Sequence, residues 1–285
     1  MEVDVHGIYV GDKSKTIGAK FHENRGKPAL LRKLNEDPTH QINWETPYYT
    51  KFIDKCLDGM DLSDKVFLDL GCGDGRFTEY LINKGVKQVV CVDSDYKTLY
   101  ELMLYSEENN FRDKIKLINC GAENVPLDNN SVDVILALGV FYYLGDEQQK
   151  GIKSMCNILK DGGTLISSEP TLEGIGLRSL IFNDIYDMVD NFNSNTFKEE
   201  QGDSEYRFPL HDKNKILSLY SDSGFKLELE KGLSIFHQFI RIMYVRGMIK
   251  KTDLEENLEN LHKIFDYLDD FGDFNKTMIY KHIKQ

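Results

Sequence analysis

Short apolar runs alternate with longer amphipathic stretches from about residue 61 onward. The runs are rich in Val, Ile and Leu, which is typical of strands buried on both faces of a sheet. They lie at residues 66–70, 88–93, 115–120, 132–138 and 164–169. Apolar residues at helical spacing occupy the stretches between them, at 76–84, 95–109 and 146–159. This alternation predicts a parallel sheet covered by helices.

The C-terminal third continues the pattern with an interruption. A helix is predicted over 213–223, and the alternating run 225–231 predicts a strand with one exposed face. Residues 277–283 predict a final strand, so about 232–275 form an insertion. Its apolar residues recur at helical spacing among acidic ones, which predicts an acidic, solvated helix or, alternatively, a partner-binding or dimerising one. They are Leu254, Leu258, Leu261, Phe265 and Leu268.

Two segments stand outside the alternation, residues 1–60 and about 170–210. Residues 191–195 and 198–205 are polar and turn-rich, which predicts a mobile loop. We therefore expect 1–60 to form an N-terminal helical cap and 171–210 a lid that contributes to a substrate site. The α/β core would then comprise residues 61–170 and 211–285.

Composition and charge narrow the class of protein. With 41% hydrophobic and 29% charged residues among 285, the chain has the composition of a soluble globular protein. A net charge of −12 repels phosphate backbones and anionic lipid, so we expect no nucleic-acid and no membrane partner. No apolar run is long enough for a membrane span and the start has no secretory pattern, so we expect a cytoplasmic protein.

The five cysteines show no pairing pattern and no spacing typical of a zinc site. We expect free structural thiols and no metal. They are Cys56, Cys72, Cys91, Cys120 and Cys156.

A glycine-rich turn follows the first predicted strand directly. Gly71, Gly73 and Gly75 permit tight turning and let a ligand approach the backbone. A dinucleotide-binding turn would carry a third glycine where this chain has Arg76, and a P-loop would carry Lys followed by Ser or Thr. The spacing is G-x-G-x-G, which neither motif has.

With Asp69 before the glycines, this stretch resembles the first motif of the class I S-adenosylmethionine-dependent methyltransferases. The resemblance implies that Asp69, Gly71, Cys72, Gly73 and Gly75 form part of a cofactor site. The second predicted strand ends in Asp93, where the family places an acid that binds both ribose hydroxyls, with Ser94 beside it. Consecutive parallel strands end at one edge of a sheet, which supports that role.

Residues 120–127 are similar to the family segment G-D-A-x-x-L-P, which surrounds the adenine. Gly121 stands where that segment has Asp, so Glu123 is the alternative acceptor for the adenine amine, while the Ala122 amide can still meet the ring. The resemblance further places Leu138 and Tyr143 near the methionine part of the cofactor. Residues 159–170 resemble the family's entry into its fifth strand.

The resemblance implies a Rossmann-like, doubly wound sheet of seven strands in the order 3-2-1-4-5-7-6, the last antiparallel, with helical lid additions. It implies S-adenosyl-L-methionine as cofactor and S-adenosyl-L-homocysteine as product. We expect methyl transfer by in-line displacement to an oxygen or nitrogen of a small-molecule acceptor, by a monomer or homodimer. The alternative is a regulatory or scaffold protein that binds the cofactor without turnover.

A hydroxyl acceptor needs a base at the carboxyl edge of the sheet. Glu169, His211 and His237 are the candidates by their positions after predicted strands or before a helix. Aromatic residues are numerous in the segments that would cover this edge and predict a closed substrate pocket. The candidates are Trp44, Tyr48, Tyr49, Phe141, Tyr142 and Tyr186.

Overall fold

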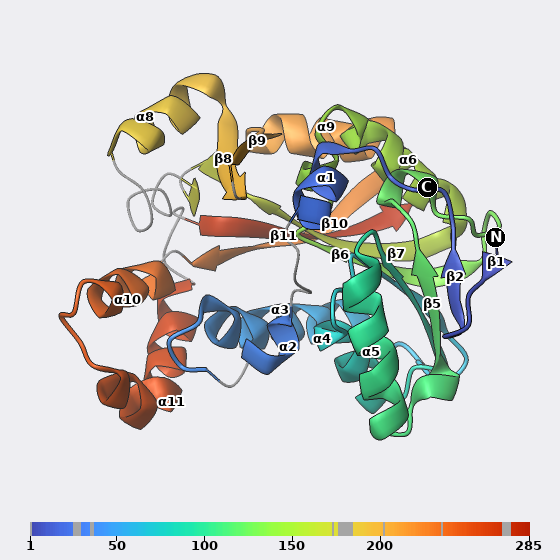
Figure 1. Ribbon diagram of the computed structural model, residues 1–285, viewed down its shortest axis with the longest axis horizontal. Coiled ribbons are helices and arrows are strands. Elements are labelled where there is room, and N and C mark those ends of the chain that lie inside the picture. Colours follow the sequence, from blue (N-terminus) through green and yellow to red (C-terminus); the bar gives the residue numbers. More distant parts are fainter. Residues whose placement is uncertain are drawn as a thin grey trace.

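The computed structural model is built around one nine-stranded sheet (Figure 1). It describes residues 2–24, 30–34, 37–172, 174–175, 185–201, 203–234, 236–269 and 275–285. From edge to edge the strands are β1 (Glu2–Val3), β2 (Ile8–Val10), β5 (Ile115–Asn119), β4 (Gln88–Asp93), β3 (Val66–Leu70), β6 (Val132–Leu138), β7 (Leu159–Pro170), β11 (Asn275–Lys284) and β10 (Phe225–Ser234).

The central strands are parallel and their carboxyl ends lie together. β2, β5, β4, β3, β6 and β7 pair in parallel, whereas β11 lies antiparallel to both β7 and β10. The predicted α/β, Rossmann-like fold is thus confirmed. The predicted count of seven strands is wrong, because β1 and β2 extend the sheet beyond β5.

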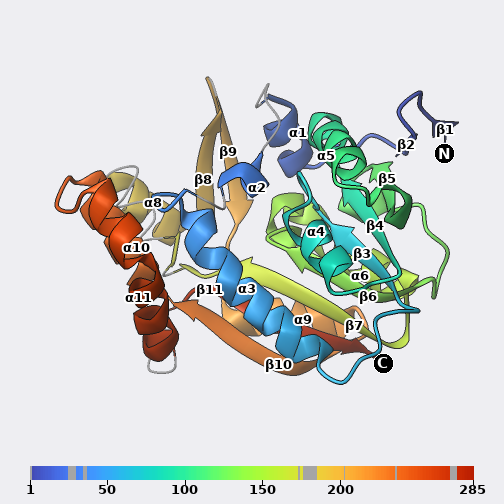
Figure 2. The same cartoon turned by 90° about the horizontal axis from the view of Figure 1, so that it is seen from below.

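Helices cover both faces of the sheet (Figures 1 and 2). On one face lie α3 (Gln41–Leu57), α4 (Arg76–Asn83) and α5 (Tyr96–Glu108), whose apolar residues share one core cluster with β3, β4 and β5. On the other lie α6 (Gln148–Ile158) and α9 (Lys213–Asp222). The near-continuous apolar strands are explained by this burial on both sides. All five cysteines are free and buried, as predicted.

The N-terminal segment is more than a helical cap. Strands β1 and β2 precede α1 (Ile17–Asn24), α2 (Leu31–Leu34) and α3. Ile8 is fully buried and pairs with Leu117 of β5. Three consecutive residues of β type, Ile-Tyr-Val, are too short a run to stand out by periodicity, and only the free edge of β5 gives them a partner.

The middle segment forms α8 (Ile185–Ser194) and a hairpin of β8 (Thr196–Gln201) and β9 (Ser204–Pro209). The predicted mobile loop at 191–195 and 198–205 is therefore wrong. Phe197 and Phe208 face each other across the hairpin and pack with Phe21 of α1. This aromatic face holds the hairpin in place, and the polar residues that suggested a loop lie at the end of α8, along the two strands and at their turn.

The insertion before the last strand is helical, as predicted, and comprises α10 (Phe236–Val245) and α11 (Lys251–Asp269). Leu254 is buried, and Leu258 and Leu261 pack on the core cluster of α3, so this stripe of α11 serves the chain's own core. The side chains of Phe265 and Leu268 lie outside the described residues. Among the helices that the structure describes, none is both long enough and apolar enough to cross a membrane.

Candidate functional site

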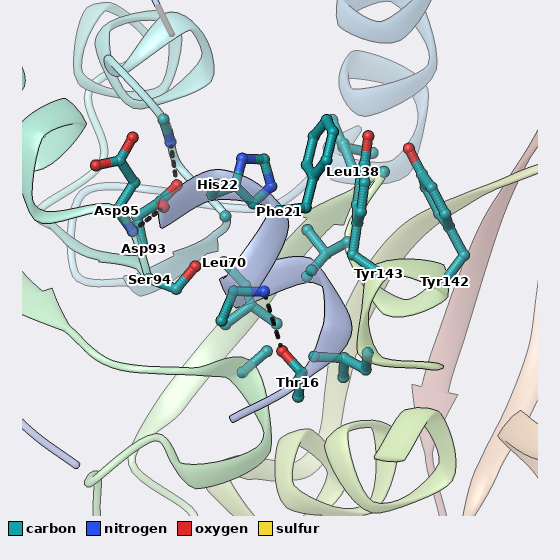
Figure 3. Close-up of a pocket in the computed structure, with 18 of the residues that line it drawn as sticks. Thr16, Phe21, His22, Leu70, Asp93, Ser94, Asp95, Leu138, Tyr142 and Tyr143 are labelled. Atoms are coloured by element: carbon teal, nitrogen blue, oxygen red, sulfur yellow. Dashed lines mark hydrogen bonds between the residues drawn. The ribbon is translucent and has the colours of Figure 1, made fainter. Parts of the chain in front are cut away.

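A cavity of about 600 Å³ lies at the carboxyl edge of the parallel strands. Its volume falls within the range of about 300–1,000 Å³ typical of ligand sites. The turns after β3, β4, β5 and β6 line it from the sheet, and α1, α3 and β8 line it from the additions. In Figure 3, Asp93, Ser94 and Asp95 lie on one side of the close-up and the rings of Phe21, Tyr142 and Tyr143 on the other.

The glycine turn forms the floor of this cavity. Gly71, Gly73 and Gly75 all have positive φ, a conformation that side chains disfavour. A Cβ on Gly71 would lie 2.7 Å from Val140 Cγ2, and one on Gly75 would lie 2.4 Å from Leu102 Cδ1. Gly71 and Gly73 line the cavity, whereas Gly75 precedes the first residue of α4 and does not. The predicted contact of Gly75 with a cofactor is therefore corrected to a structural role.

Asp69 and Cys72 are buried behind the turn and do not line the cavity. Asp69 accepts a hydrogen bond of 2.7 Å from Thr78 Oγ1 of α4, and burial raises the pKa of its carboxyl to about 6. Burial also raises the pKa of the Cys72 thiol. Both were predicted to contact a cofactor, but their side chains fix the turn from below.

Asp93 lines the cavity at the end of β4, as does Ser94. Asp93 Oδ2 accepts a hydrogen bond of 2.9 Å from the Gly73 amide, and its Oδ1 accepts one of 2.8 Å from the Asp95 amide. Asp95 in turn caps α5 by accepting from the Lys97 amide. The carboxylate of Asp93 thus connects the glycine turn to the start of α5 and faces the cavity.

Glu123 takes the space that a side chain on Gly121 would fill. An added Cβ on Gly121 would lie 2.3 Å from Glu123 Oε2 and 2.6 Å from its Oε1. Ser14 Oγ donates a hydrogen bond of 2.6 Å to Oε1, while Oε2 is buried with no hydrogen-bond partner in the described part of the chain. Ala122 lines the same wall. A buried carboxylate oxygen facing the cavity fits a ligand that donates a hydrogen bond there.

Helix α1 crosses the cavity against the segment after β6. Gly18 approaches so closely that an added Cβ would lie 2.6 Å from Tyr143 O. Phe21 stacks on Tyr143 with ring centroids 6.1 Å apart, and His22 lies 5.4 Å from the same ring. Leu138 and Tyr143, which were predicted to lie near the methionine part of the cofactor, both line the cavity. Periodicity did not predict α1 at this position, because its contacts join residues more than a hundred positions apart.

Helix α3 supplies an acid and an aromatic ring to the same cavity. Glu45 and Tyr49 are buried and line it together with Arg76 of α4. Tyr49 Oη lies 3.4 Å from Ser168 Oγ, and burial raises the pKa of Tyr49 to about 12. Burial lowers the pKa of Arg76, and the charge of Glu45 opposes that shift. Glu45 and Arg76 were missed from sequence, since a charged residue beside a predicted helix carries no signal by itself.

Of the predicted substrate residues, Tyr49 and Tyr142 line the cavity and four do not. Trp44 is buried and donates from Nε1 to Pro38 O at 2.7 Å. Tyr48 belongs to the core below α3, and Phe141 is fully buried. Tyr186 is 80% exposed on α8. Burial in the core or exposure on α8, rather than a pocket wall, therefore accounts for the placement of these four aromatic residues.

Of the predicted bases, Glu169 and His211 do not line the described cavity. Ser168 and Pro170 line it, so the alternation of β7 turns Glu169 to the opposite face, where it accepts a hydrogen bond of 2.9 Å from Tyr220 Oη. His211 lies with Nε2 3.0 Å from Gln148 Oε1, and burial lowers its pKa. His237 falls in α10, and its side chain lies outside the described residues.

Other lining residues come mostly from the additions, which periodicity did not assign to any site. They include Ser14, Thr16, Gly18, Ala19, Phe21, His22, Leu31, His40, Ile42, Thr98, Ser168, Pro170, Ile175, Phe197, Glu199, Glu200 and Thr277.

The core of this site matches a known family. Residues 68–167, which contain the glycine turn, Asp93, Glu123 and Tyr143, match the family described as "Methyltransferase domain". The chain carries a class I S-adenosylmethionine-dependent methyltransferase domain. The cofactor of this methyltransferase domain is S-adenosylmethionine, and the cavity presents the carboxylate of Asp93 and a buried acceptor oxygen of Glu123.

Curated relatives match over this domain and act on macromolecules. The chain is 30% identical over 118 residues to the ribosomal protein L11 methyltransferase of Colwellia psychrerythraea, covering 37% of each. It is 23% identical over 130 residues to the tRNA U34 carboxymethyltransferase of Cellvibrio japonicus, covering 46% of this chain and 40% of that protein. It is 30% identical over 125 residues to protein arginine N-methyltransferase 1 of Saccharomyces cerevisiae, covering 42% and 35%.

These relatives overturn an expectation drawn from charge. The names of two of them give protein substrates and that of the third a tRNA, so the prediction of a small-molecule acceptor without nucleic acid is not supported. The net charge misled because it averages over the whole surface, including the acidic face of α11, and says little about one site. The chain spans less than half the length of each of these relatives.

Solved structures share the fold of the methyltransferase domain. A putative S-adenosylmethionine-dependent methyltransferase from Listeria monocytogenes superposes with a TM-score of 0.57 at 14% identity, covering 84% of this chain and 99% of that one. The [4+2]-cyclase SpnF superposes with a TM-score of 0.53 at 14% identity, covering 83% and 80%. At this identity the likeness concerns the fold alone.

Proposed function

We propose that this chain transfers the methyl group of S-adenosylmethionine to an oxygen or nitrogen of an acceptor. One observation carries the proposal: a single cavity in the matched domain brings together the glycine turn, Asp93 and Glu123. These three features come from the ends of β3, β4 and β5. Ligands of open α/β sheets bind at this edge.

The residues of the cavity divide the work of binding. Asp93 has both oxygens in contact with backbone amides, which fixes its carboxylate toward the ribose hydroxyls. Gly71 and Gly73 leave the backbone open to close approach. Helix α1 and the ring of Tyr143 cover the opposite side and exclude water.

The bound cofactor supplies a methyl group on a positively charged sulfur, which a nucleophile displaces in line. The chain therefore contributes chiefly position and the exclusion of water. Two histidines line the described cavity, His22 and His40. His40 Nδ1 accepts a hydrogen bond from the Ile42 amide, so the proton of its neutral ring lies on Nε2. Neither ring nitrogen of His40 can then accept a proton from an acceptor hydroxyl. His22 is the lining histidine we assign to proton removal from a hydroxyl acceptor, whereas an amine bound in its neutral form needs no base.

The test measures binding and transfer separately. Isothermal titration should show S-adenosylhomocysteine binding, and Asp93→Ala should weaken it by more than about 30-fold, since two hydrogen bonds to a charged acceptor are lost. The exposed variant Asp113→Ala is the control. Radiolabelled S-adenosylmethionine is then offered with ribosomal proteins, with tRNA and with a panel of hydroxyl and amine compounds. Absence of cofactor binding would refute the proposal.

A second candidate is a cofactor-binding protein without methyl transfer. It is favoured by the position of Glu169 and His211, which lie away from the cavity. The same titration distinguishes the two candidates: tight binding of S-adenosylhomocysteine with no label in any acceptor pool supports the second one.

A further inference from the structure

Two opposite charges face the cavity beside the glycine turn. Glu45 is 6% exposed on α3, and Arg76 is the first residue of α4, partly buried. Arg76 Nη1 donates to Thr46 Oγ1 at 3.3 Å, and its guanidinium lies 4.3 Å from the centre of the Phe77 ring. Both side chains line the cavity together with Gly71 and Gly73.

This arrangement suits a ligand that itself carries both charges. Removing charges from water is costly unless each has a partner of opposite sign. A guanidinium has five donors in a planar fork that fits a carboxylate, and the hydrogen bond of Arg76 to Thr46 uses one of them. The start of α4 adds the positive end of a helix dipole, which favours an anion at the same place.

We propose that Arg76 binds the carboxylate, and Glu45 the ammonium group, of the amino-acid end of the bound cofactor. The inference rests on the proposed function, because it takes S-adenosylmethionine as the ligand. Asp93 lines the cavity at the end of β4 for the ribose, while Glu45 and Tyr49 line it from α3 and Arg76 from the start of α4. The cavity then recognises an α-amino acid as well as a nucleoside.

Two other roles of the pair lead to different results. A structural ion pair would stabilise α3 against α4 and leave ligand preference unchanged; Asp74 and Asp69 also act on Arg76 electrostatically. A role in holding a charged acceptor would change acceptor turnover and leave cofactor affinity unchanged. The experiment therefore compares ligands with and without the amino-acid end.

Isothermal titration is run with S-adenosylhomocysteine and with 5′-methylthioadenosine, which lacks the amino acid. We expect Arg76→Met and Glu45→Gln each to lower the affinity for S-adenosylhomocysteine by about 10- to 100-fold, which is the effect of losing a charged hydrogen bond. Both substitutions should change the affinity for 5′-methylthioadenosine by less than about threefold. Lys84→Met, at the other end of α4 and exposed, is the matched control.

Binding of modified ligands to the wild-type protein tests the same inference without any variant that could fail to fold. S-adenosylhomocysteine carrying an N-acetyl group or a carboxyl methyl ester loses one charge, and each should bind at least about tenfold more weakly than the parent. Equal binding of the parent, the derivatives and 5′-methylthioadenosine would overturn this inference and leave the proposed function standing. If neither nucleoside binds, the proposed function fails instead.

Discussion

Two neighbouring residues of β7, Ser168 and Glu169, face opposite sides of the sheet and have different surroundings. Ser168 lines the cavity and lies 3.4 Å from Tyr49 Oη. Glu169 lies beneath α9 and accepts from Tyr220. Both are buried polar residues on one strand. The comparison shows that burial and polarity do not identify a functional residue, whereas the presence of a cavity on its side of the sheet does.

The covered face holds a compact cluster around Glu169. Tyr220 stacks on His282 with ring centroids 4.0 Å apart, and Tyr280 lies on the same side. Burial raises the pKa of Glu169 to about 8 and lowers that of His282 to about 3. Both groups are therefore uncharged at neutral pH. A neutral, packed cluster serves stability, while the cavity face keeps charged groups that can meet a ligand.

The largest expected effect tests whether the covered face serves stability alone. Tyr220→Ala removes a ring that is 1% exposed and also the donor to Glu169. We expect the free energy of unfolding to fall by about 3–5 kcal/mol, measured by urea denaturation. The affinity of the folded protein for S-adenosylhomocysteine should stay within about twofold of wild type.

Tyr186→Ala is the control for this substitution, because Tyr186 is 80% exposed. It should change stability by no more than about 0.5 kcal/mol. Strong loss of cofactor affinity in folded Tyr220→Ala protein would contradict the separation of the two faces.

A smaller effect distinguishes Glu169 from a catalytic carboxylate. Its pKa is about 8 in the folded protein against 4.5 as reference. Folding then favours the protonated form, so this contribution to stability is fully present below pH 4.5 and is lost as pH rises through 8. Between about pH 5 and 7.5 it should lower the free energy of unfolding by about 1.4 kcal/mol per pH unit, and Glu169→Gln should remove this slope.

The measurement is urea denaturation from pH 6.5 to 8. His282 is neutral in the folded chain over this range, and its titration in the unfolded chain contributes equally to wild type and variant. Glu256→Gln, on the exposed face of α11, should keep the wild-type slope. A parallel pH dependence in Glu169→Gln and wild type would show that this carboxyl does not titrate as its burial implies.

The smallest effect belongs to the cavity face. If Glu123 Oε2 accepts a hydrogen bond from the adenine amine, Glu123→Gln should lower the affinity for S-adenosylhomocysteine by about tenfold, which is the cost of one hydrogen bond to a charged acceptor. S-inosylhomocysteine has an oxygen in place of that amine, and the Gln side chain can donate to it. The variant should therefore bind the inosine analogue better than wild type does, by titration.

Glu147→Gln, exposed and outside the cavity, should alter neither ligand. If Glu123→Gln binds S-adenosylhomocysteine and the inosine analogue more weakly to the same extent, Glu123 only supports α1 through its hydrogen bond with Ser14.

The core elements could be predicted because local sequence dictates them. The apolar runs of β3, β4 and β6 were predicted to the residue, since a strand buried on both faces needs consecutive apolar side chains and turn residues at its ends. Asp93 and Gly71 were placed correctly for a related reason: parallel strands deliver the residues that follow them to one edge. The start of β7 was missed because Gly162 and Gly163 suggested a turn there, yet the strand runs from Leu159.

The positions of the N-terminal segment and the other additions could not be predicted from local sequence. Glu45, Phe21 and Ser14 reach the cavity from segments whose place depends on partners far along the chain. Glu169 was predicted at the cavity but lies in the covered cluster, because a shift of one position along β7 turns a side chain from one face of the sheet to the other.

Periodicity and glycine spacing are local properties of the chain, so they were enough to predict the sheet, its helices and the edge where the cavity lies. The polar side chains that enter the cavity could not be predicted in this way, because tertiary packing selects them. That choice depends on how α1, α3 and the β8–β9 hairpin pack over the edge and on which face of each strand they cover. Packing between distant segments is set by the shape and burial of whole surfaces, and no short stretch of residues carries that information.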